Sequence, residues 1–249
     1  MRPEDSDELE FLKKVYSTYT VDFSKQTAKM RELAVRTFSP YLKGGTCLEL
    51  GCSDGFMTQM LAQRVENLVV VDGSKEFLLQ ASERGLSNVT FEFGLFENYQ
   101  SDTKFDYIVA SYILEHVNDP VRILKNARSL LNRDGKLFIV VPNARALSRQ
   151  LALHMGYIED LKHLTENDLN HGHRRVYDRT SLNADLAAAG LTSIHEGGLM
   201  LKLLADFQMD QLFENNFLSD EHVNGLYKLG LEYPDLCGSL FNICEAIIE

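Results

Sequence analysis

The stretch LELGCSDG at residues 48–55 decides the fold, because it joins a short apolar strand pattern to the start of a helix pattern. Layered α/β folds bind nucleotide-type ligands at such a turn, although an ordinary strand–helix turn would also fit. A dinucleotide-binding pattern needs glycines at 51, 53 and 56, but only Gly51 is present, because positions 53 and 56 are Ser53 and Phe56. In that pattern the second glycine lets the backbone approach a pyrophosphate, and the third lets the helix pack closely on the strand. The chain keeps a carboxylate, Glu49, which suits a cationic ligand without phosphate.

Apolar runs and helical patterns alternate on both sides of this stretch. Strands are expected at 47–50, 68–72, 89–93, 106–110 and 136–141, and helices between them at 55–64, 75–85 and 120–132. The run LVVVD at 68–72 is apolar throughout, as expected of a strand that is buried on both faces. Alternating strands and helices predict an α/β fold with a doubly wound, mostly parallel sheet.

The flanking sequence predicts further helices and two more strands. Helices are expected at 4–17, 24–39 and 180–189, strands near 191–197 and 239–247, and a helical insertion at roughly 203–232. Residues 147–178 form no clean unit and are rich in His, Asp, Glu and Arg. Two long insertions after strand ends are typical of lids over a pocket.

Composition narrows the class of partner. The 249 residues are 45% hydrophobic, so a substantial core is expected, and 25 basic against 36 acidic residues give a net charge of −11. This charge argues against nucleic acid, with HGHRR at 171–175 the one strong basic candidate. The acidic N-terminus does not read as a signal peptide, and no apolar run suggests a membrane partner. Four cysteines without zinc spacing predict reduced thiols and a cytoplasmic protein.

Two more strand ends carry candidate ligand contacts. Asp72 ends a strand 21 residues after Gly51, where an acid can accept hydrogen bonds from both ribose hydroxyls, although it would also fit a helix N-cap. Phe96 follows the third strand and could lie against a purine ring or belong to the core. Ser111 is expected to border the reactive end of the ligand, and His116 could be a base or a structural histidine.

Taken together, these stretches resemble the class I S-adenosylmethionine-dependent methyltransferases over roughly residues 44–145. The resemblance rests on LELGCSDG, the acid at 72, and FDYIVASYILEHVNDP followed by LLNRDGKLFIVVPN. It implies a seven-stranded, Rossmann-like sheet whose last strand is antiparallel. It also implies that the ligand is S-adenosyl-L-methionine, a sulfonium cation, and that the product is S-adenosyl-L-homocysteine.

The resemblance assigns expected contacts residue by residue. Glu49 is expected near the cofactor's amino group, Asp72 at the ribose and Phe96 at the adenine. The remaining expected cofactor residues are Gly51, Cys52, Ser53, Gly55 and Ser111. Many family members carry an acid for the adenine amino group near GLFEN at 94–98, but here Leu95 precedes Phe96. Glu97 or the backbone would have to serve instead.

The segment HLTENDLNHGHRRVYD at 163–178 is expected to face the substrate. His171 or His173 could remove a proton from the nucleophile, and Arg174 or Arg175 could hold an anionic group bidentately. A surface loop whose arginines pair with nearby acids would also fit. Histidine-rich tracts can bind zinc, but no cysteine joins these irregularly spaced histidines, so no metal is expected.

The domain plan and the function follow from these expectations. A single domain at 1–249 would comprise N-terminal helices at 1–43, a cofactor-binding core at 44–146, and substrate-side insertions at 147–178 and 200–235. The expected reaction transfers a methyl group to an oxygen or nitrogen of a small polar molecule, such as a sugar derivative or secondary metabolite. Methylation of a peptide or protein carboxylate, or a non-catalytic cofactor-binding role, are the alternatives. Both a monomer and a homodimer are compatible with the sequence.

Overall fold

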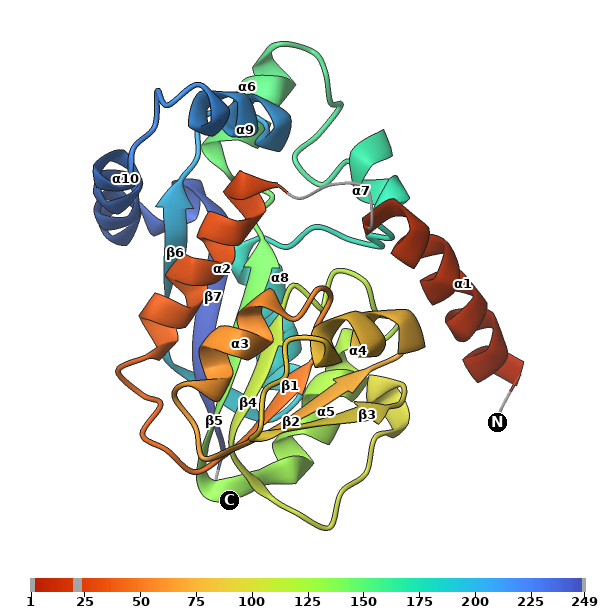
Figure 1. Cartoon of the computed structure of the whole chain (residues 1–249). Coiled ribbons are helices and arrows are strands. Elements are labelled where there is room, and N and C mark those ends of the chain that lie inside the picture. Colours follow the sequence, from red (N-terminus) through yellow and green to blue (C-terminus); the bar gives the residue numbers. More distant parts are fainter. Residues whose placement is uncertain (1–2, 20–23, 248–249) are drawn as a thin grey trace.

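A seven-stranded sheet in the order β3-β2-β1-β4-β5-β7-β6 forms the centre of the molecule in the computed structural model, which describes residues 3–19 and 24–247 (Figure 1). The strands are β1 (Thr46–Leu50), β2 (Asn67–Asp72), β3 (Val89–Phe93), β4 (Phe105–Ser111), β5 (Leu131–Pro142), β6 (Leu191–Leu201) and β7 (Cys237–Ala246). The strands from β3 to β5 pair in parallel, whereas β7 runs antiparallel to β5 and β6. The expected seven-stranded, mostly parallel sheet is therefore confirmed.

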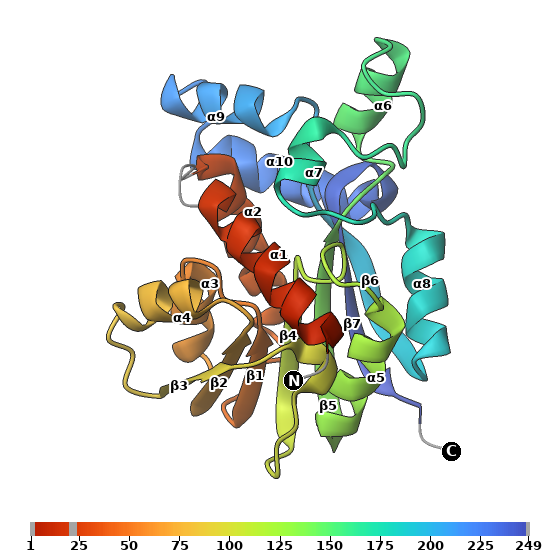
Figure 2. The same ribbon diagram turned by 90° about the vertical axis from the view of Figure 1, so that its right-hand side faces the viewer.

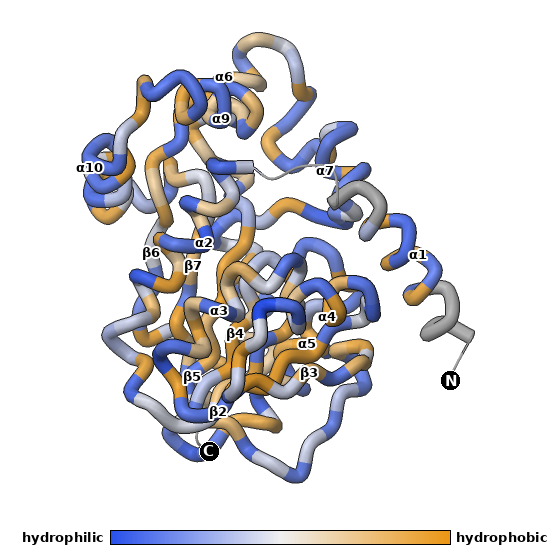
Figure 3. Tube along the Cα trace, in the orientation of Figure 1, coloured by the Kyte–Doolittle hydropathy of each residue, from blue (hydrophilic) through white to orange (hydrophobic). Residues whose placement is uncertain are grey.

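Helices cover both faces of this sheet. The helices of the described residues are α1 (Pro3–Tyr19), α2 (Lys25–Phe38), α3 (Phe56–Ala62), α4 (Lys75–Ser82), α5 (Pro120–Leu130), α6 (Leu147–His154), α7 (Glu166–Asn170), α8 (Arg179–Ala188), α9 (Asp206–Glu214) and α10 (Asp220–Glu232), with short 3-10 turns η1 (Phe96–Asn98) and η2 (Pro234–Leu236). The helices α2, α3, α4 and α10 pack one apolar cluster against the sheet, and α5 and α8 pack a second cluster against its other face. Figure 3 shows the apolar strands that these two layers enclose.

The strand order reverses between β1 and β4, and open α/β sheets bind their ligands in the crevice beyond the carboxyl ends of the strands at such a point. Parallel alignment places the loops after these strands at the same edge of the sheet. Figures 1 and 2 show α6, α7 and α9 beyond that edge, and in the view of Figure 2 helix α1 crosses in front of it. Within the described ranges, no helix combines the length and the apolar character that a membrane crossing requires.

The structure differs from the expected elements mainly near 131 and within 147–178. Strand β5 begins at Leu131, because Leu131 pairs with Phe105 before a register shift in the ladder. The segment expected to lack regular structure contains α6 and α7. A capping box starts α7, in which Thr165 and Asp168 satisfy each other's backbone N–H groups. The spacing of these two residues was the available signal for this five-residue helix.

Candidate active site

The turn after β1 has the tight backbone expected from LELGCSDG. Gly51, Ser53 and Gly55 all adopt left-handed φ angles of 76°, 48° and 74°. A Cβ atom on Gly51 would overlap Cδ1 of Ile113 and lie 3.6 Å from Cζ of Phe96. A side chain at position 51 would therefore have to displace the end of Ile113 and adopt a left-handed φ, and glycine avoids both costs. The turn therefore connects the end of β1 physically with the segments after β3 and β4.

Glu49 lies near the end of β1 with only 2% of its surface exposed. Burial raises the pKa of Glu49 to about 8, against the opposing effects of the Thr58 hydroxyl and the Arg31 guanidinium. Its Oε2 atom has no hydrogen-bond partner among the residues that the structure describes. A buried acceptor of this kind suits a ligand that brings a positive charge and its own N–H donors.

Asp72 connects the end of β2 to the turn after β1. Its Oδ2 accepts a hydrogen bond from the backbone N–H of Cys52 at 2.9 Å, and its Oδ1 accepts one from the N–H of Ser74 at 2.8 Å. Ser74, rather than Asp72, caps helix α4 through its side chain. Burial raises the pKa of the Asp72 carboxyl, although these backbone donors oppose the rise. Each carboxylate oxygen keeps lone-pair capacity for a further donor such as a hydroxyl.

Phe96, Ser111 and Tyr112 continue this wall across the next two strand ends. Phe96 begins η1 with its ring edge toward Gly51. Ser111 ends β4, and its buried Oγ finds no partner within the described part of the chain. Tyr112 adopts a left-handed φ of 58°, and its hydroxyl lies 2.9 Å from that of Ser239. The strained backbone at Tyr112 turns the chain sharply after β4.

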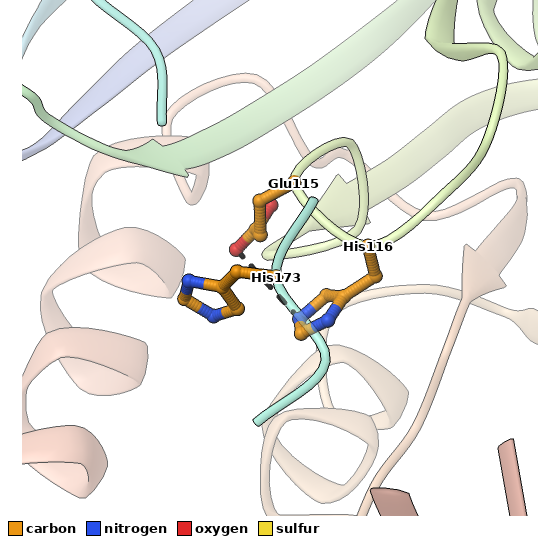
Figure 4. A group of neighbouring side chains, drawn as sticks. All are labelled: Glu115, His116 and His173. Carbon is orange, nitrogen blue, oxygen red and sulfur yellow. Dashed lines mark ion pairs between the residues drawn. The ribbon is translucent and has the colours of Figure 1, made fainter. Parts of the chain in front are cut away.

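Glu115, His116 and His173 form a second cluster on the loop that follows this turn (Figure 4). The carboxylate of Glu115 is fully buried, and neither oxygen accepts a hydrogen bond from a described residue. His116 Nε2 lies 4.0 Å from Glu115 Oε1, and the two imidazole rings meet edge to face with centroids 4.8 Å apart. Segment 171–175 contributes His173, and the backbone N–H of Arg174 donates to the carbonyl of Glu115 at 2.8 Å.

The three side chains of this cluster differ in their preferred charge. Burial raises the pKa of Glu115 to about 7, whereas burial and the neighbouring His173 lower the pKa of His116 to about 3. Burial alone would lower the pKa of His173, but Asp168 and Glu115 outweigh it and raise the value. At neutral pH His116 is therefore uncharged, Glu115 is close to its pKa, and the surroundings of His173 favour its charged form.

Arg174, an expected anion clamp, faces helix α1. Its Nη2 donates to the carboxylate of Glu8 at 2.9 and 3.2 Å, and its guanidinium lies 4.3 Å from the centre of the Phe11 ring. A Cβ atom on Gly172 would lie 2.6 Å from Val15, so α1 packs closely on this segment. On the cofactor side, a Cβ atom on Gly73 would lie 2.5 Å from Leu12 of the same helix. Helix α1 thus contacts both halves of the crevice.

The neighbouring residues His171 and Arg175 make local contacts. His171 Nδ1 lies 2.8 Å from the carbonyl oxygen of Asn167. Arg175 donates to the backbone carbonyls of Leu114, Val117 and Asn118 and so holds the loop after β4 in place. The alternative in which arginines of this segment pair with nearby acids describes Arg174, whereas Arg175 is held by carbonyls. Catalytic roles for His171 and Arg174 remain predictions.

The profile of a protein family described as methyltransferase domain matches residues 23–196, which is more than half of the chain. The chain belongs to this methyltransferase family. The expected class, the S-adenosylmethionine-dependent methyltransferases with the class I fold, is thereby confirmed.

The methyltransferase resembles curated relatives over part of their length. It is 33% identical over 106 residues to a ubiquinone biosynthesis O-methyltransferase of Coxiella burnetii (strain RSA 493 / Nine Mile phase I), covering 41% of this chain and 45% of the relative. A protein of the same name from Glaesserella parasuis serovar 5 is 31% identical over 121 residues, covering 45% and 51%. The methyltransferase therefore spans about half the length of the curated relatives it matches.

Solved structures share the fold over nearly the whole chain. The DhpI–S-adenosylhomocysteine complex superposes with a TM-score of 0.61 at 17% identity, covering 97% of this chain and 96% of that one. The N-methyltransferase NodS from Bradyrhizobium japonicum WM9, in complex with S-adenosyl-L-homocysteine, gives 0.60 at 14% identity, covering 91% and 90%. At these identities the likeness establishes the architecture.

Sequence reasoning missed four residues that build this site in the methyltransferase. Ile113 fills the space beside Gly51, Glu115 is the buried acid of the cluster, and Asp168 and Glu8 pair with His173 and Arg174. The sequence does contain a signal for Glu115, because this acid directly precedes the candidate base His116 in LEHV at 114–117. Glu8 had none, since 166 residues separate it from Arg174.

Proposed function

We propose that the methyltransferase transfers the methyl group of S-adenosylmethionine to a hydroxyl oxygen of a small polar molecule. The observation that carries this proposal is the buried Glu115–His116–His173 cluster directly beyond the cofactor turn. A hydroxyl must lose its proton to react, so it benefits from a nearby base, whereas a carboxylate acceptor needs none. The O-methyltransferase names of the relatives support the same choice.

Three residues at strand ends would bind the cofactor. Two of them are acids that can accept further hydrogen bonds, and the third is an aromatic residue. Glu49 would pair with the ammonium group, Asp72 would accept from the ribose hydroxyls, and Phe96 would line the adenine. Gly51, Cys52, Ser53, Gly55 and Ser111 would shape the wall around the methionine moiety. The cofactor supplies an electrophilic methyl group on its positive sulfur when it is bound.

The protein's part in the reaction is alignment and proton removal. The acceptor oxygen forms a bond to the methyl carbon, the carbon–sulfur bond breaks, and sulfur keeps the electron pair. The acceptor's proton passes to the imidazole of His173, which Asp168 and Glu115 favour in its charged form. Orientation of the two reactants supplies up to about 7–11 kcal/mol, and general-base catalysis contributes about 10²–10⁴-fold.

A panel of acceptors tests this proposal. Phenols, sugar hydroxyls, amines and carboxylic acids are each incubated with protein and S-adenosylmethionine, and S-adenosylhomocysteine release is measured. Hydroxyl acceptors should turn over, and His173→Ala should lower kcat by about 100-fold or more while leaving cofactor affinity unchanged. His154→Ala, at an exposed histidine that ends α6, is the matched control and should retain activity. Turnover confined to amines or carboxylates, or an unaffected His173→Ala variant, would overturn the proposal.

A further inference from the structure

His173 is held by a carboxylate that the cofactor site does not use. Its Nδ1 lies 3.2 Å from Oδ1 of Asp168, and its backbone N–H donates to the carbonyl of Asp168 at 2.8 Å. The two side chains are only 15% and 14% exposed. Both residues lie in one short stretch, so the pairing is built into the turn that follows α7.

The other oxygen of Asp168 is fixed independently of the histidine. Oδ2 accepts hydrogen bonds from the backbone N–H of Thr165 at 2.9 Å and from its hydroxyl at 2.7 Å. Arg149 of α6 approaches the same oxygen at 3.3 Å. One oxygen is thus fixed by donors from α6 and the α7 cap, which leaves Oδ1 directed at the imidazole.

The charges around this pair favour an ionised aspartate, and they stabilise the positive charge that the imidazole gains when it accepts a proton. Burial would raise the pKa of Asp168, but the neighbouring His173, the hydrogen bonds from Thr165 and the charge of Arg149 hold it well below its usual range. His173 is faced by Asp168 from α7, by Glu115 and His116 from the loop after β4, and by Arg149 from α6. Two of these groups are acids that stabilise positive charge on the ring, and Arg149 opposes it.

We propose that Asp168 is the positioning residue that fixes His173 as the proton acceptor, by pairing its Oδ1 with Nδ1 across 3.2 Å and leaving Nε2 for the acceptor hydroxyl. This inference rests on the proposed function. The acceptor O–H bond breaks, its proton forms a new N–H bond at Nε2, and the oxygen's electron pair attacks the methyl carbon. Asp168 takes no proton and stabilises the imidazolium that forms, as a carboxylate does beside a hydrogen-bonded histidine base.

A purely structural role for Asp168 makes a different prediction. The residue also completes the cap of α7, so its loss could act by unfolding that helix. Thr165→Val removes the hydroxyl that supports the cap but leaves the Asp168 carboxylate beside the ring. If capping were the whole role, Thr165→Val and Asp168→Asn would lower activity to a similar extent.

The decisive variant is Asp168→Asn, compared with Thr165→Val and with Glu166→Gln, which removes an exposed acid from the same helix. The side-chain amide introduced by Asp168→Asn would donate to Nδ1 and place the ring proton on Nε2. We expect kcat to fall by about 10²–10⁴-fold, with KM and cofactor affinity changed less than about threefold. Glu166→Gln should match the wild type, and Thr165→Val should lose less than about tenfold.

Histidine NMR titration of the S-adenosylhomocysteine complex gives a readout that needs no acceptor. The His173 signal, assigned by its absence in His173→Gln, should titrate about one pH unit or more lower in Asp168→Asn than in the wild type and in Glu166→Gln. An unchanged His173 titration in Asp168→Asn, or equal kcat losses in Asp168→Asn and Thr165→Val, would overturn the inference. If the wild type methylates no hydroxyl, the proposed function fails, while the titration still decides whether Asp168 governs His173.

Discussion

The two halves of the crevice are built in different ways. The cofactor half consists of turns that directly follow β1, β2, β3 and β4, and its hydrogen bond between Cys52 and Asp72 joins residues only 20 positions apart. The acceptor half joins α1, the loop after β4 and the 147–178 segment, and its Arg174–Glu8 pair spans 166 positions. Strand ends of a parallel sheet place the first set automatically, whereas the second set depends on side-chain pairing between remote segments.

Two glycines with the same backbone conformation, one in each half, allow the most direct comparison of the two halves. Gly51 in the cofactor turn and Gly156 after α6 have φ angles of 76° and 74°. A Cβ atom on Gly51 would overlap Ile113, whereas one on Gly156 would meet nothing within 4 Å. Both alanine variants carry the left-handed strain of about 1–2 kcal/mol. We expect only Gly51→Ala to lose cofactor affinity as well, by about 100-fold or more, which is about 2.7 kcal/mol by isothermal calorimetry. Equal affinities in the two variants would contradict the steric argument.

Asp72→Ala tests the ribose contact in the same half. Loss of a charged acceptor for two hydroxyls should weaken S-adenosylhomocysteine binding by about 2–3 kcal/mol, or about 30- to 150-fold. Glu76→Gln, an exposed acid on the adjoining α4, is the matched control. Because Asp72 also holds Cys52 and Ser74, thermal unfolding of each variant checks that the turn survives. Unchanged calorimetric affinity would refute the ribose role.

The contrast between the halves explains what the sequence predicts and what it does not. Gly51 and Asp72 were predictable because a strand pattern fixes where its last residue and the next turn lie. The apolar run at 68–72 is enough to place Asp72 at the end of a strand. Glu8 was not predictable, because many acids in this chain could pair with Arg174. Asp168 is only five positions from His173, but several other acids of the same segment could have paired with that histidine. Only the packing of α1 and α7 selects among them.

If Glu49 pairs with the cofactor's ammonium group as we propose, cofactor binding should depend on pH. Burial raises the pKa of Glu49 to about 8, so the ligand-free protein holds a proton there below that pH. The cofactor's ammonium group favours the ionised carboxylate, and binding therefore releases the proton. Affinity should rise by up to about tenfold per pH unit between pH 6 and 8, until the cofactor's amino group itself loses charge near about 8.

Calorimetry at pH 6, 7 and 8 in buffers of different ionisation enthalpy measures this proton release, and Glu49→Gln should remove the dependence. The same raised pKa means that Glu49 stabilises the ligand-free fold fully below about pH 4.5, its unfolded value. That contribution is lost as the pH rises through about 8. An affinity that falls between pH 6 and 8 would exclude Glu49 as the partner of the ammonium group.

Glu8→Gln probes the link that α1 makes between the halves. The Glu8–Arg174 pair is 12% and 23% exposed, and Arg174 also stacks on Phe11. We expect loss of this ion pair to weaken the packing of α1 on the rest of the protein by about 1 kcal/mol. The KM for the acceptor should rise by up to about fivefold, with kcat nearly unchanged. Glu10→Gln, an exposed acid on the same helix, should leave both constants unaltered. A variant at Glu8 that behaves like Glu10→Gln would show that α1 contributes nothing to the acceptor half.

Removal of metal ions should have the smallest effect. One ligand atom each from Glu115, His116 and His173 lies within 4.8 Å of the others, which is compact enough for a divalent cation. His173, however, holds its proton more tightly than a free histidine and already pairs with Asp168, so a cation would have to displace that proton. Dialysis against EDTA should leave turnover within about twofold of the untreated enzyme. A loss that Mg²⁺ or Zn²⁺ restores would instead make this cluster a metal centre, and the acceptor half would then be organised by an ion rather than by the Asp168–His173 pair.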